Sequence, residues 1–370
     1  MDVCVPTEVK NHEGRVAITP AGVHELTVHG HRVHVQAGAG LGAGISDDDL
    51  VAAGAHLTPD ADATWDAGEL VLKVKEPVAS EYGYLRPGQT VFTYLHLAAD
   101  KALTEELLAR RVTTIAYETV QTASGALPLL APMSEVAGRL ATQVGAATLQ
   151  NAAGGRGVLL GGVPGVGAAH VVVIGAGTSG MNAARIATGM GARVTLLDKD
   201  VDVLRAADRE LGGRVQTLTS NRLTVTEAVR DADLVVGAVL VPGAKAPVLV
   251  SNDLVATMRP GSVLVDIAID QGGCFEDSRA TTHDRPTYRV HDTVFYCVAN
   301  MPGAVARTST YALTNVTLPY AVALADAGWC DALRADPALA AGLNTHDGAV
   351  VHAAVADAHG MGRVPVAELL

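Results

Sequence analysis

A glycine pattern in the middle of the chain constrains its fold more than any other feature. The apolar run His170–Ile174 is followed by Gly175, Gly177 and Gly180 in the spacing G-x-G-x-x-G, and the next apolar run ends at an acidic residue, Asp198. A strand, a glycine-rich turn, a helix and a second strand ending in an acid form the pattern of a dinucleotide-binding βαβ unit. The sequence therefore predicts such a unit starting at residue 170.

The residues of this pattern are suited to hold a pyrophosphate. Gly175 permits the tight turn, Gly177 lets the backbone approach the phosphates, and Gly180 lets the helix pack closely against the strand. Thr178 and Ser179 lie at the start of the helix, whose first N–H groups and positive dipole end attract phosphate. Because the chain contains 39 glycines, the spacing alone would also fit an ordinary glycine-rich turn. The apolar strand before it, the alanine-rich helix after it and the acid together favour the dinucleotide site.

Asp198 also indicates which dinucleotide binds. A carboxylate at this position accepts hydrogen bonds from the adenosine ribose hydroxyls and repels a 2′-phosphate, so it favours NAD over NADP. The neighbouring Lys199 is a signal for NADP, but we expect its side chain to face solvent. We therefore predict NAD as the cofactor.

The position of the pattern predicts two domains. A chain of 370 residues is too long for one ordinary core, and a whole domain's length precedes the pattern. Strand-like and helix-like segments alternate on both sides of it, as in parallel sheets with helical crossovers. The predicted strands cover residues 32–37, 70–75, 90–96, 112–118, 170–174, 193–198, 215–218, 234–240, 262–268 and 294–298. The predicted helices cover residues 20–28 after the cap Thr19, 101–111 after the cap Asp100, 134–150 and 304–327.

We expect an α/β fold of two Rossmann-like domains, each with a parallel sheet, and an active-site cleft between them. Residues 1–128 and 306–370 form the predicted substrate and catalytic domain, and residues 129–305 form the predicted NAD-binding domain. The two long helices at 134–150 and 304–327 are expected to connect the domains, because they flank the dinucleotide unit.

Composition excludes several other classes of function. The formal net charge of -12 argues against a nucleic acid or an anionic membrane as partner. The four cysteines are scattered without a C-x-x-C pair, so we expect no disulfide framework or zinc site and a cytoplasmic location. No signal peptide is visible at the start of the sequence. Residues 157–184 carry no charged side chain, but glycines and Pro164 break them into strand-sized pieces, so we expect no membrane span.

A group of histidines also invites a metal-binding interpretation. His29, His31 and His34 lie close together in the sequence, across an expected turn and strand, but no carboxylate or cysteine beside them completes a ligand set. We therefore expect a solvated loop and strand face there, and no metal.

Polar residues at the ends of apolar strands are candidates for catalysis. Lys75 and His96 end two predicted strands, and Arg15 lies in the loop after the first strand-like segment. An amino-acid or oxo-acid dehydrogenase needs a cation that clamps a carboxylate, which suits Arg, and an acid/base near neutral pH, which suits His. From their spacing alone, Arg15 and Lys75 are equally compatible with solvated surface charges, and His96 with an ordinary histidine at a strand end.

Seven stretches in the same order resemble one known family. They read PTEVKN at 6–11, RVAITP at 15–20, KVKEP at 73–77, YLHLA at 94–98, LGGVPGV at 160–166, VDIAIDQGG at 265–273 and VANMPGA at 298–304. The chain is similar to the L-alanine dehydrogenases over essentially its full length. It departs from them at Phe295, where the family has a histidine, and at Ala306, where it has a proline. Neither departure touches the candidate catalytic residues.

The resemblance implies an activity and a set of site residues. The family performs the reversible, NAD-dependent oxidative deamination of L-alanine to pyruvate and ammonia. By resemblance, the catalytic residues are His96, Asp270 and Lys75, and the substrate-binding residues are Arg15, Lys75, Tyr94, Glu118, Met133 and Asn300. The cofactor-binding residues implied in the same way are Ser134, Gly175, Gly177, Thr178, Ser179, Gly180, Asp198, Ser220, Val239, Leu240, Asn300 and Met301. It also implies a homo-hexamer.

Three other functions remain as alternatives. The fold also resembles the soluble NAD-binding subunit of proton-translocating transhydrogenases, which needs no amino-acid pocket. A lysine- or saccharopine-type dehydrogenase would take a larger amino acid, and a non-catalytic NAD sensor would need no acid/base. The presence of Arg15, Lys75, His96 and Asp270 together favours an amino-acid dehydrogenase over the transhydrogenase subunit, and the acid/base set argues against a non-catalytic sensor.

Overall fold

The chain folds into two compact units. The structure is a computed structural model that describes residues 1–239 and 246–370. Unit 1 comprises Met1–Met133 and Val305–Leu370, and unit 2 comprises Ser134–Ala304. The boundaries predicted from the sequence are 128/129 and 305/306, and the predicted roles of the two domains stay predictions. Leu240, which it assigned to the cofactor site, lies outside the described residues.

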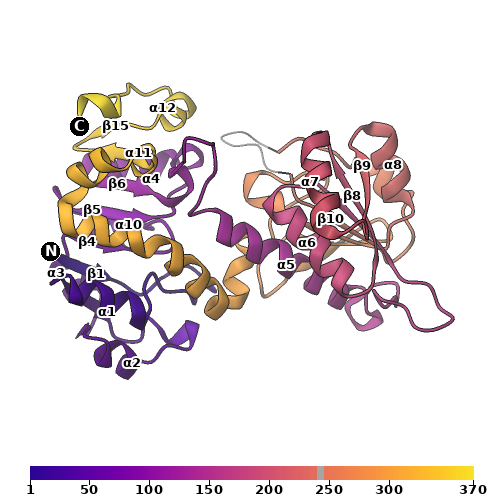
Figure 1. The fold of residues 1–370 in the computed structure, drawn as a ribbon, viewed down its shortest axis with the longest axis horizontal. Helices are drawn as coiled ribbons and strands as arrows, with labels where there is room; N and C mark the ends of the chain where they lie inside the picture. The colour runs from indigo at the N-terminus through magenta and orange to yellow at the C-terminus, as the bar shows by residue number, and fades with distance from the viewer. Residues whose placement is uncertain (240–245) are drawn as a thin grey trace. The chain divides into compact units, whose positions relative to one another are not determined.

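Unit 1 is built on one eight-stranded sheet (Figure 1). Its order is β15-β14-β6-β5-β4-β1-β2-β3. The strands are β1 (Asp2–Val5), β2 (Arg32–Gln36), β3 (His56–Thr58), β4 (Leu70–Leu72), β5 (Thr90–Thr93), β6 (Thr113–Ala116), β14 (Leu343–His346) and β15 (Ala349–Val350). The first six are parallel, whereas β14 and β15 form an antiparallel hairpin beside β6. The sheet is therefore mostly parallel, with an antiparallel edge made by the end of the chain.

Several helices of unit 1 start at residues whose side chains cap them. They are α1 (Pro20–Val28), α2 (Asp47–Ala52), α3 (Ala61–Ala67), α4 (Lys101–Ala109), α10 (Ala306–Ala335), α11 (Pro337–Ala341) and α12 (Ala353–His359). The Thr19 hydroxyl accepts from the N–H of Gly22, and the Asp100 carboxylate accepts from the N–H of Leu103, as capping requires. Both predicted caps are confirmed. Helix α10 changes direction at Gly328, whose φ of 75° is not helical.

Unit 2 has a seven-stranded sheet in the order β12-β13-β11-β10-β7-β8-β9. Its strands are β7 (His170–Ile174), β8 (Arg193–Asp198), β9 (Gln216–Thr219), β10 (Leu234–Gly237), β11 (Val263–Asp266), β12 (Thr287–Val290) and β13 (Thr293–Tyr296). Its helices are α6 (Thr178–Gly189), α7 (Val201–Leu211), α8 (Arg222–Arg230) and α9 (Asn252–Val255). Helix α5 (Ala131–Thr148) begins in unit 1 and continues into unit 2. Only β12 runs antiparallel to its neighbour among the paired strands described in this sheet.

Both sheets have the strand order of a Rossmann fold. In unit 2 the order β9-β8-β7-β10-β11-β13 corresponds to 3-2-1-4-5-6, and in unit 1 the order β3-β2-β1-β4-β5-β6 corresponds to the same sequence. The predicted α/β class with two mostly parallel sheets is confirmed. In such sheets a ligand binds beyond the carboxyl ends of the strands, where the order reverses. This point lies between β1 and β4 in unit 1, and between β7 and β10 in unit 2.

The central strands are apolar because helices cover both sheet faces. Every residue of β7, β10 and β11 is buried, and these strands are rich in valine, as is usual for parallel strands covered on both sides. One cluster of unit 2 packs Val172, Val235 and Leu264 against the aromatic rings of Phe275 and Phe295. The Phe275 and Phe295 rings meet edge to face, with centroids 6.0 Å apart.

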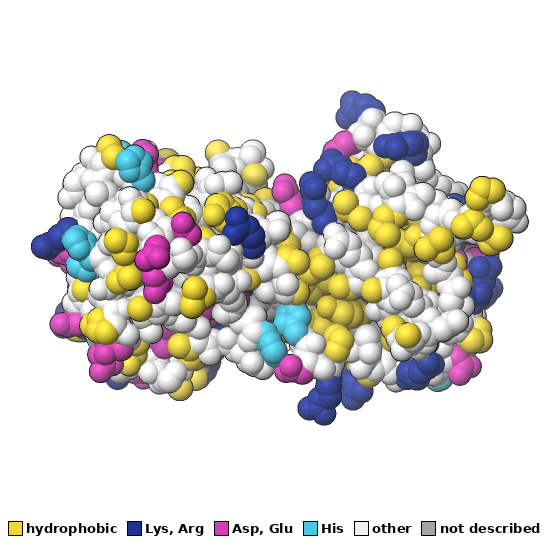
Figure 2. Space-filling model, turned by 90° about the horizontal axis from the view of Figure 1, so that it is seen from below, with side chains coloured by type: hydrophobic (Ala, Val, Ile, Leu, Met, Phe, Trp, Pro, Cys, Tyr) yellow, Lys and Arg dark blue, Asp and Glu magenta, His cyan; other side chains and the backbone are white. Residues whose placement is uncertain are grey.

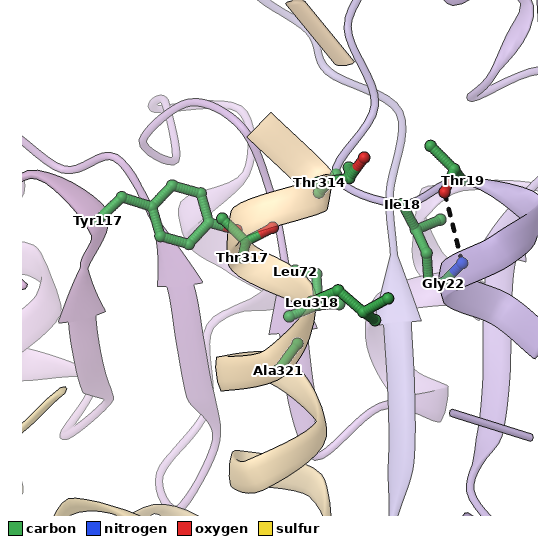
Figure 3. Close-up of a pocket in the computed structure, with 10 residues that line it drawn as sticks. Ile18, Thr19, Gly22, Leu72, Tyr117, Thr314, Thr317, Leu318 and Ala321 are labelled. Atoms are coloured by element: carbon green, nitrogen blue, oxygen red, sulfur yellow. Dashed lines mark hydrogen bonds between the residues drawn. The ribbon is translucent and has the colours of Figure 1, made fainter. Parts of the chain in front are cut away.

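A small cavity in unit 1 is a packing gap rather than a ligand site (Figure 3). It lies between α10, β4 and the start of α1, and the side chains of Ile18, Leu72, Leu318 and Ala321 line it. Its volume is about 10 Å³, which is room for no more than one water molecule. The site of chemistry must be sought at the strand ends instead.

Charge is distributed unevenly over the surface. On the face shown in Figure 2, most of the visible Asp and Glu side chains lie on unit 1, whereas Lys and Arg side chains are concentrated on unit 2. No helix among the described residues is long and apolar enough to cross a membrane. The uncharged run 157–184 divides instead into loop, strand β7 and the first part of α6.

Candidate active site

The loops after β1 and β4 carry two of the candidate substrate-binding residues. Arg15 follows β1, and Lys75 follows β4, so both lie beyond the carboxyl ends of neighbouring parallel strands. These are the two strands between which the strand order reverses in unit 1. The fold therefore provides a ligand position at the place where the sequence puts these two cations.

A buried ion cluster ties these two loops together. The Lys73 ammonium lies 2.8 Å from Glu81 and 3.2 Å from Glu8, and none of the three is exposed. Glu8 also accepts a 2.6 Å hydrogen bond from the N–H of Val74. Burial lowers the pKa of Lys73, but the two carboxylates outweigh it and raise this pKa, so the lysine stays charged. The segment that carries Lys75 is thus fixed to the loop after β1.

Arg15 is itself held by a carboxylate. Its Nε and Nη2 atoms donate to the two oxygens of Glu13 at 2.7 and 2.5 Å, and its Nη1 lies 3.2 Å from the sulfur of Met133. Both members of this ion pair are buried. Burial lowers the pKa of the Arg15 guanidinium, but the Glu13 hydrogen bonds outweigh this and raise it. Bidentate pairing fixes the plane of the guanidinium. The predicted neighbours Arg15 and Met133 are therefore in contact.

His96 lies at a turn after β5 in a left-handed backbone conformation, with φ 52° and ψ 35°. Its N–H donates a 2.6 Å hydrogen bond to Glu118, and its Nδ1 lies 3.9 Å from the same carboxylate. The imidazole ring stacks on Tyr94 with an interplanar angle of 2° and centroids 6.0 Å apart. Tyr94 donates to the carbonyl of Leu129, and burial raises the pKa of its phenol, so it remains a donor at neutral pH. The structure thus brings Tyr94, His96 and Glu118 together.

The glycine-rich turn of unit 2 has the geometry that a pyrophosphate needs. A Cβ at Gly180 would collide with the carbonyl oxygen of Gly175, so the helix packs against the turn only without a side chain there. Gly175 has a φ of +100°, and a Cβ on it would lie 2.6 Å from the carbonyl oxygen of Ala238 and 3.1 Å from Val239. By contrast, a Cβ at Gly177 would meet nothing within 4 Å. Among the described side chains none caps the start of α6, which is the kind of helix N-terminus that binds phosphate.

Asp198 connects the second strand to this turn. One of its oxygens accepts a 2.7 Å hydrogen bond from the N–H of Ala176, and the other accepts from Asp200 at 2.9 Å. The carbonyl of Asp198 also receives the N–H of Ser220 at 2.8 Å. The predicted residues Asp198 and Ser220 therefore meet beside the glycine turn.

The remaining candidates of unit 2 follow β11 and β13. Asp270 lies in a short helical turn after β11, and its two carboxylate oxygens each lie 3.4 Å from the N–H of Asn300. Asn300 has a φ of 57°. Met301 is buried at the start of the next turn. Ser134 lies in α5, and the described contacts do not join it to the other cofactor candidates.

Three buried acids near the candidate residues were not found from the sequence. Glu13 pairs with Arg15, Glu8 holds the backbone before Lys75, and Asp266 holds the turn that carries Asp270. Asp266 accepts 2.9 Å hydrogen bonds from the N–H groups of Ala268 and Cys274, and burial raises the pKa of its carboxyl. Among these acids, Asp266 lies in a stretch that also contains a candidate residue, Asp270, whereas Glu8 lies in a stretch without one and Glu13 lies between two stretches.

The histidine group of the sequence analysis pairs with an acid from the other end of the chain. A ring nitrogen of His29 lies 2.9 Å and one of His31 lies 2.8 Å from Asp326 of α10, so this acid links the two histidines by hydrogen bonds. Among residues 1–239 and 246–370, no group of three or more ligating side chains is arranged to hold a metal ion. Burial raises the pKa of the Cys297 thiol to about 11 and that of Cys274 well above its usual range, so both are neutral thiols.

One Rossmann-like sheet carries a glycine-rich dinucleotide turn, and the other carries cations and a histidine at its strand ends. This combination is typical of two-domain dehydrogenases that bind a nucleotide. Residues 4–137 match the family model for the alanine dehydrogenase/PNT N-terminal domain, and residues 141–353 match the one for the C-terminal domain. The chain therefore belongs to the alanine dehydrogenase/PNT family.

Individual relatives are similar to the chain over its full length. The alanine dehydrogenase of Mycolicibacterium smegmatis is 66% identical over 96% of both chains, and that of Halomonas elongata is 59% identical over 100% of both. A solved L-alanine dehydrogenase superimposes with a TM-score of 0.94 at 50% identity, covering 97% of this chain and 99% of that one. A transhydrogenase from Sinorhizobium meliloti gives a TM-score of 0.83 at 27% identity, covering 95% and 100%.

Proposed function

We propose that the chain catalyses the reversible oxidative deamination of L-alanine to pyruvate and ammonia with NAD. The observation that carries this proposal is identity of 54–66% to several alanine dehydrogenases over at least 96% of the chain. The related transhydrogenase structure is more distant, at 27% identity. The family therefore supports an oxidoreductase that acts on alanine, and the choice of NAD rests on the residues of unit 2.

Arg15 and Lys75 bind the substrate carboxylate in this proposal. Pairing of the Nε and Nη2 atoms of Arg15 with Glu13 fixes the plane of the guanidinium, and its Nη1 atom contacts Met133, another residue assigned to the substrate pocket. Glu13 also offsets the charge of Arg15. Lys75 then supplies a net positive charge for the carboxylate, and it contacts the oxygen on the reacting carbon.

His96 is the principal acid/base in this proposal. It takes a proton from the substrate ammonium, because hydride can leave Cα only when the nitrogen carries a lone pair that forms the C=N bond. Water then adds to the iminopyruvate carbon. His96 and Asp270 move the protons that convert the adduct into pyruvate and ammonia. Imidazole is suited to this work because its ordinary pKa lies close to neutral pH.

NAD fits the residues of unit 2. Gly177 leaves open space above the uncapped start of α6 for the pyrophosphate, and Asp198 provides a carboxylate for the ribose hydroxyls. Asn300 and Met301 border the nicotinamide, and Ser134, Thr178, Ser179, Ser220 and Val239 line the rest of the cofactor site. When bound, NAD accepts the hydride from Cα of alanine.

A spectrophotometric assay tests the function. NAD reduction is followed at 340 nm with L-alanine, glycine, L-lysine or no amino acid, and NADH oxidation with pyruvate plus ammonium. Activity with alanine and pyruvate, and little with lysine, is the expected result. Activity with lysine instead would favour the lysine-type alternative, and hydride exchange between nucleotides without any amino acid would favour a transhydrogenase.

We also propose a homo-hexamer located in the cytoplasm, as the family resemblance implies. Size-exclusion chromatography with light scattering measures the mass directly, and each chain contributes 37.9 kDa. A monomeric or dimeric mass would overturn the proposed assembly.

A further inference from the structure

We propose that Glu118 is a positioning residue that holds His96 in its left-handed backbone conformation, rather than a wall of the substrate pocket. The inference rests on the acid/base role proposed for His96. It is carried by two consecutive backbone N–H groups that donate to one carboxylate. The N–H of His96 lies 2.6 Å from Oε1 of Glu118, and that of Leu95 lies 3.3 Å from both oxygens.

The conformation of His96 needs such support. Its φ of 52° lies in a region that residues with a Cβ rarely adopt, because the Cβ approaches the neighbouring backbone. Strand β5 ends at Thr93, so the N–H groups of Leu95 and His96 have no strand partner. The Glu118 carboxylate takes the place of that partner and satisfies both donors where the chain turns.

The ring of His96 is supported separately. It stacks on Tyr94, whose own ring packs edge to face on Tyr117 at 5.1 Å between centroids. The backbone is thus held by Glu118 and the ring by Tyr94. Together they fix the direction of an imidazole whose side chain is 46% exposed.

Glu118 is itself anchored independently of His96. It lies in a short turn after β6, and the neighbouring Thr119 hydroxyl donates to the carbonyls of Ala116 and Gly342. Asn344 of β14 donates a 2.8 Å hydrogen bond to the same hydroxyl. Replacing the side chain at 118 therefore leaves the turn in place, so the variants should fold.

The test compares Glu118→Ala, Glu118→Gln and a matched control. Gln keeps an acceptor oxygen for the N–H groups, whereas Ala keeps none. Glu106→Ala is the control, because it removes a carboxylate of α4 that pairs with Arg110 one turn further along the chain. The readouts are kcat and KM for alanine, and hydrogen–deuterium exchange of peptides that cover residues 94–97.

We expect Glu118→Ala to lower kcat at least tenfold with KM for alanine within twofold, and to speed amide exchange in residues 94–97 alone. Glu118→Gln should restore the protection and most of kcat, and Glu106→Ala should match the unaltered chain. Unchanged exchange in Glu118→Ala, or a rise in KM in both Glu118 variants with kcat unchanged, would overturn the inference. A chain without any activity on alanine would overturn the proposed function, whereas the exchange measurement still decides the role of Glu118.

Discussion

One carboxylate oxygen of Asp198 accepts a 2.7 Å hydrogen bond from the backbone N–H of Ala176, inside the glycine-rich turn. The residue assigned to the ribose is thus also a structural tie between β8 and the turn that receives the pyrophosphate. Its replacement must therefore affect two properties, the choice of cofactor and the shape of the turn.

Asp198→Gly should shift preference toward NADP by roughly tenfold or more in the ratio of kcat/KM values, which corresponds to ~1.4 kcal/mol. The cause is loss of the charge that repels a 2′-phosphate. Because the tie to Ala176 is lost as well, kcat/KM with NAD should fall at the same time. Asp198→Asn, which keeps an oxygen acceptor, is the control that separates charge from shape. An unchanged NADP/NAD ratio in both variants would mean that the ribose is held elsewhere.

Gly177→Ala should weaken NADH binding without loss of stability, whereas Gly180→Ala should lower the stability of the fold. A methyl group at 177 enters open space, so the melting temperature should stay within ~2 °C while NADH binding weakens about tenfold or more, because the methyl occupies the phosphate position. A methyl group at 180 collides with the Gly175 carbonyl, so unfolding should become easier by on the order of 3 kcal/mol. Thermal unfolding and NADH fluorescence titration measure the two effects. Equal loss of stability in both variants would contradict this account of the turn.

His96→Ala should lower kcat in both directions by about 10²–10⁴-fold, because a positioned acid/base contributes that much. NADH should still bind with its normal affinity, since the glycine turn belongs to unit 2. Exposed His24→Ala serves as the control for removing a histidine from unit 1. Full turnover by the His96 variant would remove this residue from the mechanism.

His170 should make unit 2 less stable at mildly acid pH. Its ring is buried and hydrogen-bonded to Thr195 at 2.8 Å, and burial lowers its pKa. Above about pH 6.5 His170 is neutral in both the folded and the unfolded chain, so the stability that its neutral ring contributes is fully present. As pH falls below that value the unfolded chain binds the proton first, so stability declines, by at most ~1.4 kcal/mol per pH unit. Urea unfolding of the chain and of His170→Gln between pH 7.5 and 5 should show a shallower decline in the variant.

Local sequence patterns were sufficient for elements whose ends carry a chemical signal. The helix predicted at 20–28 is α1 to the residue, because Thr19 and Pro20 mark its start. Strands β7 and β8 also match their predicted bounds, since a glycine follows the first and an acid is the last residue of the second. The strand predicted at 90–96 ends instead at Thr93, because apolar patterning does not show where the backbone turns left-handed.

Elements that depend on distant pairing could not be predicted in this way. The hairpin of β14 and β15 has short strands and no strong alternation, and it is fixed by bonds such as that between Thr114 and Thr345, which lie 231 positions apart. The same limit applies to the site. The predicted strand ends identified Lys75 and His96 as candidates, and the loop after the first strand identified Arg15. The pairing of Arg15 with Glu13 could not be predicted, because it depends on the direction of two side chains within one loop. The roles of these residues stay predictions until the variants are measured.

The two units are formed by different parts of the chain, so the ribosome makes their residues in a fixed order. Unit 2 is one continuous stretch, Ser134–Ala304, whereas unit 1 needs both ends of the chain. The ribosome therefore completes every residue of unit 2 before it makes α10 and β14, the strand that pairs with β6. During that interval β6 has an unpaired edge, and the newborn N-terminal segment must avoid pairing with other chains. Strand β14, which covers this edge of β6, is made only after all of unit 2.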